Sequence, residues 1–285
     1  MRSVKFLVAA AAASLLSSGA FAADMAIAPA PMYGPPPVHE FGGWYLRGDI
    51  GFSNQSVHHI AMADGRNAKL TSLQETTAFD TAGVFGLGVG YQFNSWLRGD
   101  IVGQYRGNSN FKGTDLITYP NGSGLVANGV DNYSASKSEW LVMANGYVDL
   151  GTWWCVTPFI GAGVGAARVT IANYTDNGAN NNNGSYIGGP LNPSYAGAAS
   201  ASKWNLAWAL HTGLAYKVSP GLTLELAYSY INMGDGQTGP VTTFEGFTRG
   251  VSMQFKDITS HDVKLGVRWN LDSAPVYSPP LIRKG

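Results

Sequence analysis

The stretch Lys203–Val218, KWNLAWALHTGLAYKV, alternates between two kinds of side chain along its whole length. Large apolar residues fill nearly all the even-numbered positions from Trp204 onwards, while Lys203, Asn205 and His211 are among the residues at the odd ones. A period of two indicates a β-strand, because successive side chains of a strand point to opposite faces of the sheet. The run is also longer than the ~10 residues of a tilted strand that crosses a lipid bilayer.

Seven other segments alternate in the same way, so the body of the chain is predicted to contain eight long strands. In chain order these segments are GWYLRGDIGFS (43–53), GVFGLGVGYQF (83–93), WLRGDIVGQYR (96–106), EWLVMANGYVDL (139–150), TPFIGAGVGAARVTI (157–171), LTLELAYSYI (222–231) and HDVKLGVRWNL (261–271).

The connections between these segments alternate between short and long. The short ones are 94–95, 151–155 and 219–221, and the long ones are 54–80, 107–137, 173–201 and 232–260. In an antiparallel meander, this alternation places every long loop at one end of the sheet and every short turn at the other. Outer-membrane barrels have this asymmetry, with long loops outside the cell and short turns in the periplasm.

The opposite characters of the two strand faces decide between a soluble and a membrane fold. A soluble β-sandwich would have to bury unpaired charge or leave large apolar faces in water, and both arrangements are unfavourable. A barrel in lipid resolves the conflict, because its apolar face points outward and its polar face inward. The sequence therefore predicts an all-β fold: a closed eight-stranded antiparallel up-and-down transmembrane β-barrel with four long extracellular loops and three short periplasmic turns.

Both ends of the chain differ from the barrel body, which is predicted to span 41–271. Residues 1–22 have a basic start, a short apolar run and a small-residue end, the pattern of a cleaved secretory signal peptide. The proline-rich residues 23–40 and 272–285 are interpreted as a periplasmic lead and a C-terminal tail. Cys155 is the single cysteine, so no intramolecular disulfide is expected.

The charge balance argues against a nucleic-acid partner. Removal of Arg2 and Lys5 with the signal peptide takes the 18 basic residues to 16, against 18 acidic ones, for a net charge near −2. Charged residues make up 13% of the chain, and glycine is abundant at 37 residues. This composition is unusual for a soluble domain of this size and provides no basic surface for nucleic acid.

The sequence LRGDI occurs twice, at Leu46–Ile50 and at Leu97–Ile101. Both copies fall on predicted strands that run in the same direction, with one glycine-rich strand between them. An adhesion role for Arg-Gly-Asp is disfavoured, because a tripeptide in mid-strand at membrane depth cannot reach a receptor. We expect instead that the arginine of one copy pairs with an inward carboxylate, such as the aspartate of the other copy.

The inward face of the predicted barrel carries charges of both signs. Side chains fill the lumen of an eight-stranded barrel, and buried charges must be partnered. We therefore expect an interior network that plugs the barrel, formed by Arg47, Asp49, Arg98, Asp100, Glu139, Asp149, His211, Glu225, Lys264 and Arg268. Arg106, Lys203 and Lys217 share this inward parity.

On three of these segments (the entry strand GWYLRGDIGFS, the seventh strand with its extension LTLELAYSYINMG, and the closing HDVKLGVRWNL) the chain resembles a known family. These are the small outer-membrane barrels of alphaproteobacteria, major surface proteins of rhizobia, brucellae and bartonellae, similar in fold to the transmembrane domain of OmpA. The last strand also resembles the C-terminal signal that the outer-membrane assembly machinery reads, at Lys264, Gly266, Trp269 and Leu271. It departs from that signal in ending on leucine and in being followed by a tail.

The search for reactive sites assigns no catalytic residue, cofactor or metal. His58 and His59 are adjacent in the first long loop, and part of the resembling family is associated with haemin binding, so the pair is a weak haem or metal candidate. His261 and Asp262 lie near the outer end of the last strand, but adjacent residues of a strand point to opposite faces. His211 is interpreted as part of the interior hydrogen-bond network.

The predicted function is that of a non-enzymatic protein of the outer membrane, which contributes to envelope integrity and displays its loops at the surface. The loops are rich in Asn, Gly, Ser and Tyr, which favours adaptable, weakly ordered surface contact. The expected partners are outer-membrane lipid, lipopolysaccharide, the assembly machinery and a host or environmental ligand. Two alternatives stay open: a surface protein that binds haem or a host component, and a small porin.

Overall fold

The computed structural model describes residues 42–64, 69–121, 123–183 and 186–271. The predicted signal peptide, proline-rich lead and C-terminal tail lie outside the described residues. No helix among the described residues is long and apolar enough to cross a membrane.

Eight strands form a closed antiparallel ring in chain order, and each contains one of the eight predicted segments to within one residue at an end. Their bounds are β1 (Gly43–Ser56), β4 (Ala82–Gln92), β5 (Leu97–Pro120), β6 (Val126–Asp149), β7 (Val156–Asn183), β9 (Ala201–Ser219), β10 (Leu222–Thr243) and β11 (Thr248–Asn270). Each strand pairs with the next, and β11 pairs with β1 to close the barrel.

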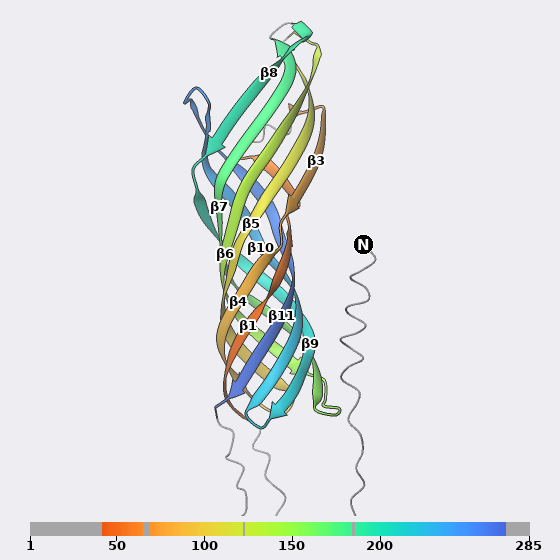
Figure 1. The fold of residues 1–285 in the computed structure, drawn as a ribbon, viewed down its shortest axis with the longest axis vertical. Helices are drawn as coiled ribbons and strands as arrows, with labels where there is room; N and C mark the ends of the chain where they lie inside the picture. Colours follow the sequence, from red (N-terminus) through yellow and green to blue (C-terminus); the bar gives the residue numbers. More distant parts are fainter. Residues whose placement is uncertain (1–41, 65–68, 122, 184–185, 272–285) are drawn as a thin grey trace, which may run out of the picture. The chain divides into compact units, whose positions relative to one another are not determined.

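The pairing register fixes the stagger of the ring. From Ser56 on β1, cross-strand partners follow around the barrel through Thr259, Asn232, Trp208, Val164, Ala144, Ile101 and Val89, and return to β1 at Leu46. The return point lies ten residues from the start, so this eight-stranded barrel has a shear of ten. Such a stagger tilts the strands against the barrel axis, as Figure 1 shows.

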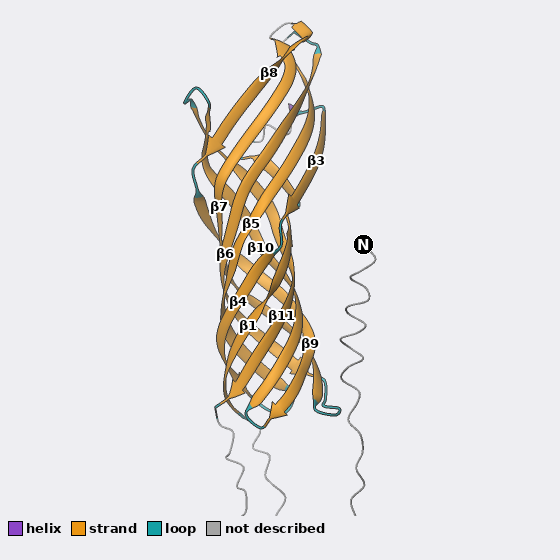
Figure 2. Ribbon diagram, in the orientation of Figure 1, coloured by secondary structure: helices purple, strands orange, loops and turns teal. Residues whose placement is uncertain are grey.

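The four long connections are present at one end, but most of their length is strand rather than weakly ordered loop. The ring strands continue into them, and three further strands are added: β2 (His59–Met62), β3 (Ser72–Phe79) and β8 (Tyr186–Ala198). β2 pairs with β11, β3 with β5, and β8 with β7 and the end of β10. Figure 2 shows that strands reach nearly to the tip of this extension, so its surfaces are held in place by backbone hydrogen bonds.

Irregularities separate the ring from the extension and reverse which residues face inward. On β5 the register slips between Arg106 and Ser109, two buried residues of opposite parity. Asn173 on β7 and Asp257 on β11 have positive φ angles of 54° and 51°, also where these strands pass from the ring into the extension. A slip of one residue turns every following side chain to the other face of the sheet.

The outward face of the ring is apolar, as lipid requires. Leu87 and Leu206 are each 76% exposed there, and similar exposed residues continue around all eight strands. Aromatic pairs mark the two borders of this band: Trp44 packs edge-on against Tyr91 near the short turns, and Tyr105 packs on Trp140 near the extension. Aromatic girdles of this kind lie at the membrane interfaces of outer-membrane barrels.

The interior changes from charged to apolar along the barrel axis. The half near the short turns holds the buried arginines and carboxylates, whereas the half near the extension holds the largest apolar cluster. In that cluster, the ring of Phe111 lies 5.1 Å from that of Phe79 and 5.0 Å from that of Phe255, measured between centroids. The extension therefore has apolar residues inside and polar residues outside, the reverse of the ring.

Candidate functional site: the charged interior of the barrel

Glu225 of β10 lies at the centre of the charged interior, between three arginines. Its Oε1 lies 3.4 Å from Arg98 Nη1 and 3.5 Å from Arg268 Nε, and its Oε2 lies 3.6 Å from Arg47 Nη2. These separations are those of ion pairs rather than of well-aligned hydrogen bonds, and Oε1 accepts none in this arrangement. Glu225 is 2% exposed, so one buried carboxylate balances several buried guanidinium groups.

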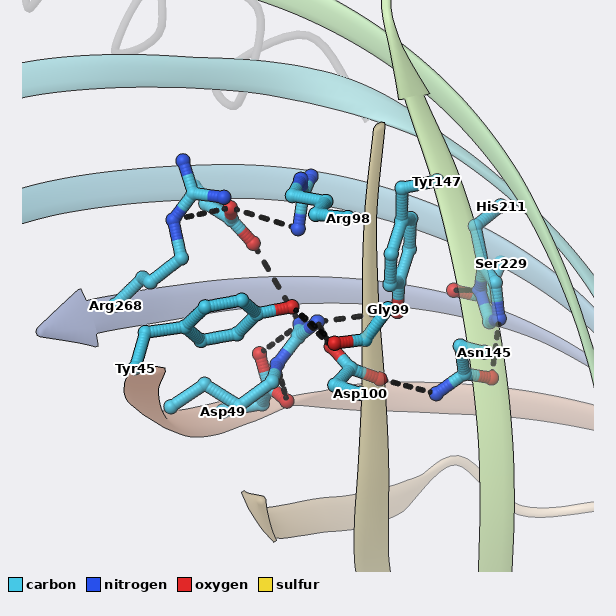
Figure 3. A network of polar contacts seen from close by, with 12 residues as sticks. Tyr45, Asp49, Arg98, Gly99, Asp100, Asn145, Tyr147, His211, Ser229 and Arg268 are labelled. Atoms are coloured by element: carbon cyan, nitrogen blue, oxygen red, sulfur yellow. Dashed lines mark hydrogen bonds and ion pairs between the residues drawn. The ribbon is translucent and has the colours of Figure 1, made fainter. Parts of the chain in front are cut away.

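The two LRGDI copies meet through Arg47. Its Nη1 donates to Asp100 Oδ2 over 2.7 Å, and its Nη2 and Nε donate to Asp49 over 2.8 and 3.2 Å. The strand between the copies makes this reach possible, because a Cβ at Gly88 would lie 3.2 Å from the Arg47 side chain and 2.8 Å from a carbonyl oxygen. Figure 3 shows Asp49 and Asp100 near each other in this interior, beside Tyr45.

Two buried tyrosines frame the network, and neither was among the predicted residues. The Tyr147 hydroxyl accepts a hydrogen bond from Arg47 over 3.0 Å, and the Arg98 guanidinium lies 4.3 Å from the Tyr147 ring centroid. The Tyr45 hydroxyl bonds the Gly99 carbonyl and Asp100. The parity of β6 places Tyr147 inward, beside Asn145 and Asp149, and this was the signal that could have identified it.

Two further ion pairs continue the network toward the extension. Arg106 Nη2 donates to Asp262 Oδ2 over 2.6 Å, and both side chains are fully buried. Lys137 bonds Glu139 and Gln55, and its ammonium lies 4.7 Å from the Phe79 ring centroid, where the apolar cluster begins. Lys137 falls in the predicted loop 107–137, whereas β6 is already strand at that position.

Charge is balanced among the described residues inside the barrel. The buried cations are Arg47, Arg98, Arg106, Lys137, Lys264 and Arg268, and the buried anions of the same region are Asp49, Asp100, Glu139, Asp149, Glu225 and Asp262. Arg98 pairs with Asp149 over 3.1 Å, and Lys264 lies in the field of Asp49 and Asp262. A neutral, side-chain-filled lumen closed above by an apolar cluster is suited to sealing the barrel rather than to conducting ions.

A chain of hydrogen bonds runs from His211 in the same interior. His211 Nδ1 lies 2.8 Å from Ser229 Oγ and its Nε2 lies 3.2 Å from Asn145 Oδ1, while the Asn145 amide donates to Asp100. Figure 3 shows this chain beside the arginine cluster. A serine beside a histidine can form a nucleophile, but Ser229 is fully buried, so a substrate cannot reach its hydroxyl.

The remaining predicted residues lie at separate places. Lys217 is exposed near the short turns, so it does not join the buried network. Lys203 is partly exposed and pairs with Asp235 over 3.1 Å at the border of the extension. His261 faces outward and bonds the Tyr228 hydroxyl, while Asp262 faces Arg106 inside, so the two cannot act together.

The adjacent histidines lie apart from the network, whereas Gly266 of the assembly-like residues pairs across the strands with both Asp49 and Glu225. His58 lies between β1 and β2 and His59 begins β2; both are exposed, with ring centroids 5.3 Å apart. No group of three or more metal-binding side chains occurs within the residues the structure describes. Trp269 points to the lipid side at 62% exposure, and Gly266 sits where a Cβ would meet Asp49 at 2.6 Å.

The match to a family model decides the classification of this barrel. The outer membrane protein beta-barrel domain matches residues 8–270, nearly the whole chain. The chain belongs to the outer membrane protein beta-barrel family. As a member of this family it resides in the cell outer membrane, with the extension outside the cell and the short turns in the periplasm.

Curated relatives of this outer-membrane barrel come from several bacteria. An uncharacterized protein of Brucella abortus is 30% identical over 230 residues, covering 77% of this chain and 78% of its own. Outer membrane protein PagN of Salmonella typhimurium is 30% identical over 201 residues, covering 67% and 75%. A putative adhesin of Rickettsia bellii is 29% identical, covering 80% and 88%.

Solved structures of outer-membrane proteins align with the barrel at low sequence identity. Neisserial surface protein A aligns with a TM-score of 0.40 at 17% identity, covering 80% of this chain and 97% of that one. OprG from Pseudomonas aeruginosa aligns with a TM-score of 0.41 at 14% identity, covering 80% and 96%.

A second group of carboxyls, one of them buried and the others partly buried, lies in the extension of this outer-membrane barrel, beyond the aromatic border of the lipid-facing band. Glu75, Asp115 and Asp131 are direct cross-strand partners on β3, β5 and β6. Burial, together with Glu75, raises the pKa of Asp115 to about 6. Burial, together with Asp131, raises the pKa of Asp176 to about 7, against the opposing effect of Arg249.

These carboxyls predict that the extension becomes more stable as the pH falls. Their folded-state pKa values exceed the ~3.9 of an unfolded aspartate, so the folded state holds protons that the unfolded chain releases between about pH 4 and 7. The free energy of unfolding should therefore rise from pH 8 to pH 5, most of it below pH 7. We expect about 1–2 kcal/mol rather than the ~4 kcal/mol of the two pKa values alone, because solvent around the extension screens these charges. Thermal unfolding of the refolded protein measures this rise, and Asp176→Asn should reduce it. An equal rise in that variant would contradict the assignment.

Proposed function

We propose that this protein is a non-enzymatic outer-membrane protein that contacts surfaces outside the cell through a hairpin turn of its extension. Its sealed barrel would anchor this extension and contribute to envelope integrity. The observation that carries the proposal is a pair of exposed aromatic residues at the β10–β11 turn: Phe244 is 81% exposed and Phe247 is 69% exposed. Aromatic side chains of this kind commonly supply most of the binding energy at protein interfaces.

The turn is held rigidly enough to serve as a contact surface. The Phe244 N–H donates to the Tyr195 carbonyl of β8 over 3.0 Å, and the Thr243 N–H donates to the Phe247 carbonyl over 3.0 Å. Tyr195 is itself 45% exposed. We name Tyr195, Phe244 and Phe247 the rim patch. Because the backbone already fixes these groups, binding would cost little conformational entropy.

The names of the relatives support a role for the rim patch in contact with surfaces outside the cell. PagN is an outer membrane protein, and the Rickettsia relatives carry the name of putative adhesins. The proposal rests on the combination of this kinship with aromatic residues exposed at the far end from the lipid-facing band. The fully buried Ser229 and the balanced interior favour a binding role over an enzymatic one.

Replacement of both phenylalanines tests the proposal. Cells that display Phe244→Ser/Phe247→Ser should adhere to host epithelial cells at least about tenfold less than cells with the unchanged protein, the effect of losing interface hot spots. Leu125→Ser is the matched control, because it removes an exposed apolar residue from another hairpin tip. Surface abundance is measured in parallel. Equal adhesion of the double variant and the unchanged protein would reject the rim patch as the contact surface.

The charged interior of the barrel ring predicts that the protein does not act as a small porin. The purified protein in a planar bilayer should show no steady conductance steps, because ion pairs and the phenylalanine cluster around Phe111 fill the lumen. Phe111→Ala should leave the bilayer silent as well, because the charged pairs below it remain. Steady steps that vary with substitutions at Arg47 or Arg98 would show a conducting path and would replace the sealed-barrel proposal.

A further inference from the structure

Three neighbouring ring strands are interrupted at the same border, where the lipid-facing ring meets the extension. β1 ends before His58, β10 has register shifts beyond Asn232, and β11 bends at Asp257, whose φ of 51° is rare for a residue other than glycine. These irregularities open an outward-facing groove with a volume of about 480 Å³. The outer groove is lined by Ser56, Val57, His58, Tyr230, Asn232, Asp257 and Thr259.

The outer groove lies directly above the lipid-facing band on the same strands. Phe52, Val263 and Tyr228 form one cross-strand row, with exposures of 70%, 55% and 42%. Four residues further along, Ser56, Thr259 and Asn232 form another row. Strands rise ~3.4 Å per residue and tilt by ~40°, so the second row lies roughly 10 Å above the first.

That height is where the outer leaflet presents its headgroups. The interfacial layer of a bilayer adds ~5–8 Å to each side of the hydrocarbon core. The molecule that meets the outer groove is therefore the headgroup of a lipid already packed against Phe52 and Val263. The continuity of the groove with the lipid-facing band identifies its occupant as a membrane lipid rather than a soluble protein.

The lining of the outer groove favours a sugar over a phosphate. Tyr230 presents an aromatic ring whose centroid lies 5.5 Å from that of Trp208. The groove also contains hydroxyl, amide and imidazole groups, which can donate hydrogen bonds to sugar hydroxyls or accept them. Asp257 is the exposed carboxylate at its edge, a good acceptor for hydroxyl donors and repulsive toward phosphate. Lys256, the neighbouring cation, is paired with Asp235 over 3.1 Å.

We propose that the outer groove binds a sugar unit of lipopolysaccharide, the glycolipid of the outer leaflet. Its volume falls within the 300–1,000 Å³ of small-molecule sites. The bulge at Asp257 then has a function: it aims a carboxylate at the sugar, at the cost of a backbone conformation that few residues adopt. This site is separate from the rim patch, and neither depends on the other.

Lipid competition on the folded protein tests this site. The protein is reconstituted in nanodiscs with equal amounts of lipid A, whose headgroup is a phosphorylated sugar, and phosphatidylglycerol, whose headgroup is a phosphorylated glycerol. Native mass spectrometry of the released protein counts the retained lipids. The unchanged protein should retain lipid A at least tenfold over phosphatidylglycerol, and Tyr230→Ala/Asp257→Ala should lose that preference. Equal retention of the two lipids by the unchanged protein would overturn the proposal.

The control variants separate a specific groove from a general effect of aromatic residues at the membrane border. Tyr105→Ala removes such an aromatic residue on β5, across the barrel, and should leave the preference unchanged; an equal loss there would also overturn the proposal. Tyr230→Phe and Thr259→Val remove single hydroxyls with little change of shape, so they serve if the alanine variant does not fold. Each should lower the preference several-fold, and no change in either variant would contradict sugar recognition.

Discussion

Replacing Glu225 with glutamine is expected to destabilise the folded barrel by about 3 kcal/mol or more. The substitution keeps the size of the side chain and removes its charge, so Arg47, Arg98 and Arg268 lose a shared counter-ion in a buried position. Breaking a buried ion pair by removing one partner typically costs ~3–5 kcal/mol, because the remaining charge is uncompensated. Urea unfolding in lipid vesicles, followed by the heat-dependent shift of the folded form on gels, measures the change.

Two further variants identify the cause of that loss. Glu245→Gln removes a fully exposed carboxylate and should leave the unfolding midpoint unchanged. Glu225→Gln/Arg268→Gln removes a cation together with the anion, so it should lose less stability than the sum of the single variants. Additive losses would mean that Glu225 and Arg268 do not stabilise each other, and the interior network would need another description.

Placing a charge on the lipid-facing side should destabilise the barrel for the opposite reason. Leu87 on β4 is 76% exposed and lies between the aromatic borders of the apolar band. Leu87→Arg is expected to cost ~2–4 kcal/mol in a bilayer, the cost of an arginine near the membrane midplane of an outer-membrane barrel. The yield of folding into vesicles and the urea midpoint both measure this cost.

Leu87→Met is the matched control, because it keeps an apolar side chain of similar size on the same lipid-facing position. Its folding yield should equal that of the unchanged protein. If Leu87→Arg folds into vesicles with unchanged yield and urea midpoint, this face does not contact lipid. That result would contradict the orientation of all eight ring strands, because they share one alternation.

The alternation of residues predicted the ring and its orientation. Each of the eight predicted segments is a ring strand, because a membrane strand must expose apolar side chains at every second position over a long run. The same parity indicated which charges point inward, and Arg47 and Asp100 do lie 2.7 Å apart. Lys217 departs from this rule because it stands near the short turns, where solvent rather than protein surrounds an inward-parity side chain.

The strands of the extension could not be predicted from the sequence, for a physical reason. Outside lipid the outward face is polar and the apolar residues turn inward, so the contrast between the faces reverses. Ile101 is outward and Phe111 inward although both have odd numbers, because the slip after Arg106 exchanges the faces. If the same inward and outward alternation is assumed along the whole of β5, the strand is predicted to end at this slip. The strand in fact continues to Pro120.

The sequence by itself determined the class of fold, the number of ring strands and which face of each strand is polar, because local alternation and turn length carry that information. Tertiary structure alone decided the stagger of the ring, the partners of each buried charge, the strand-built extension and the outer groove. These features depend on where distant strands come into register and where bulges fall. Those choices follow from packing around the whole ring rather than from any single segment.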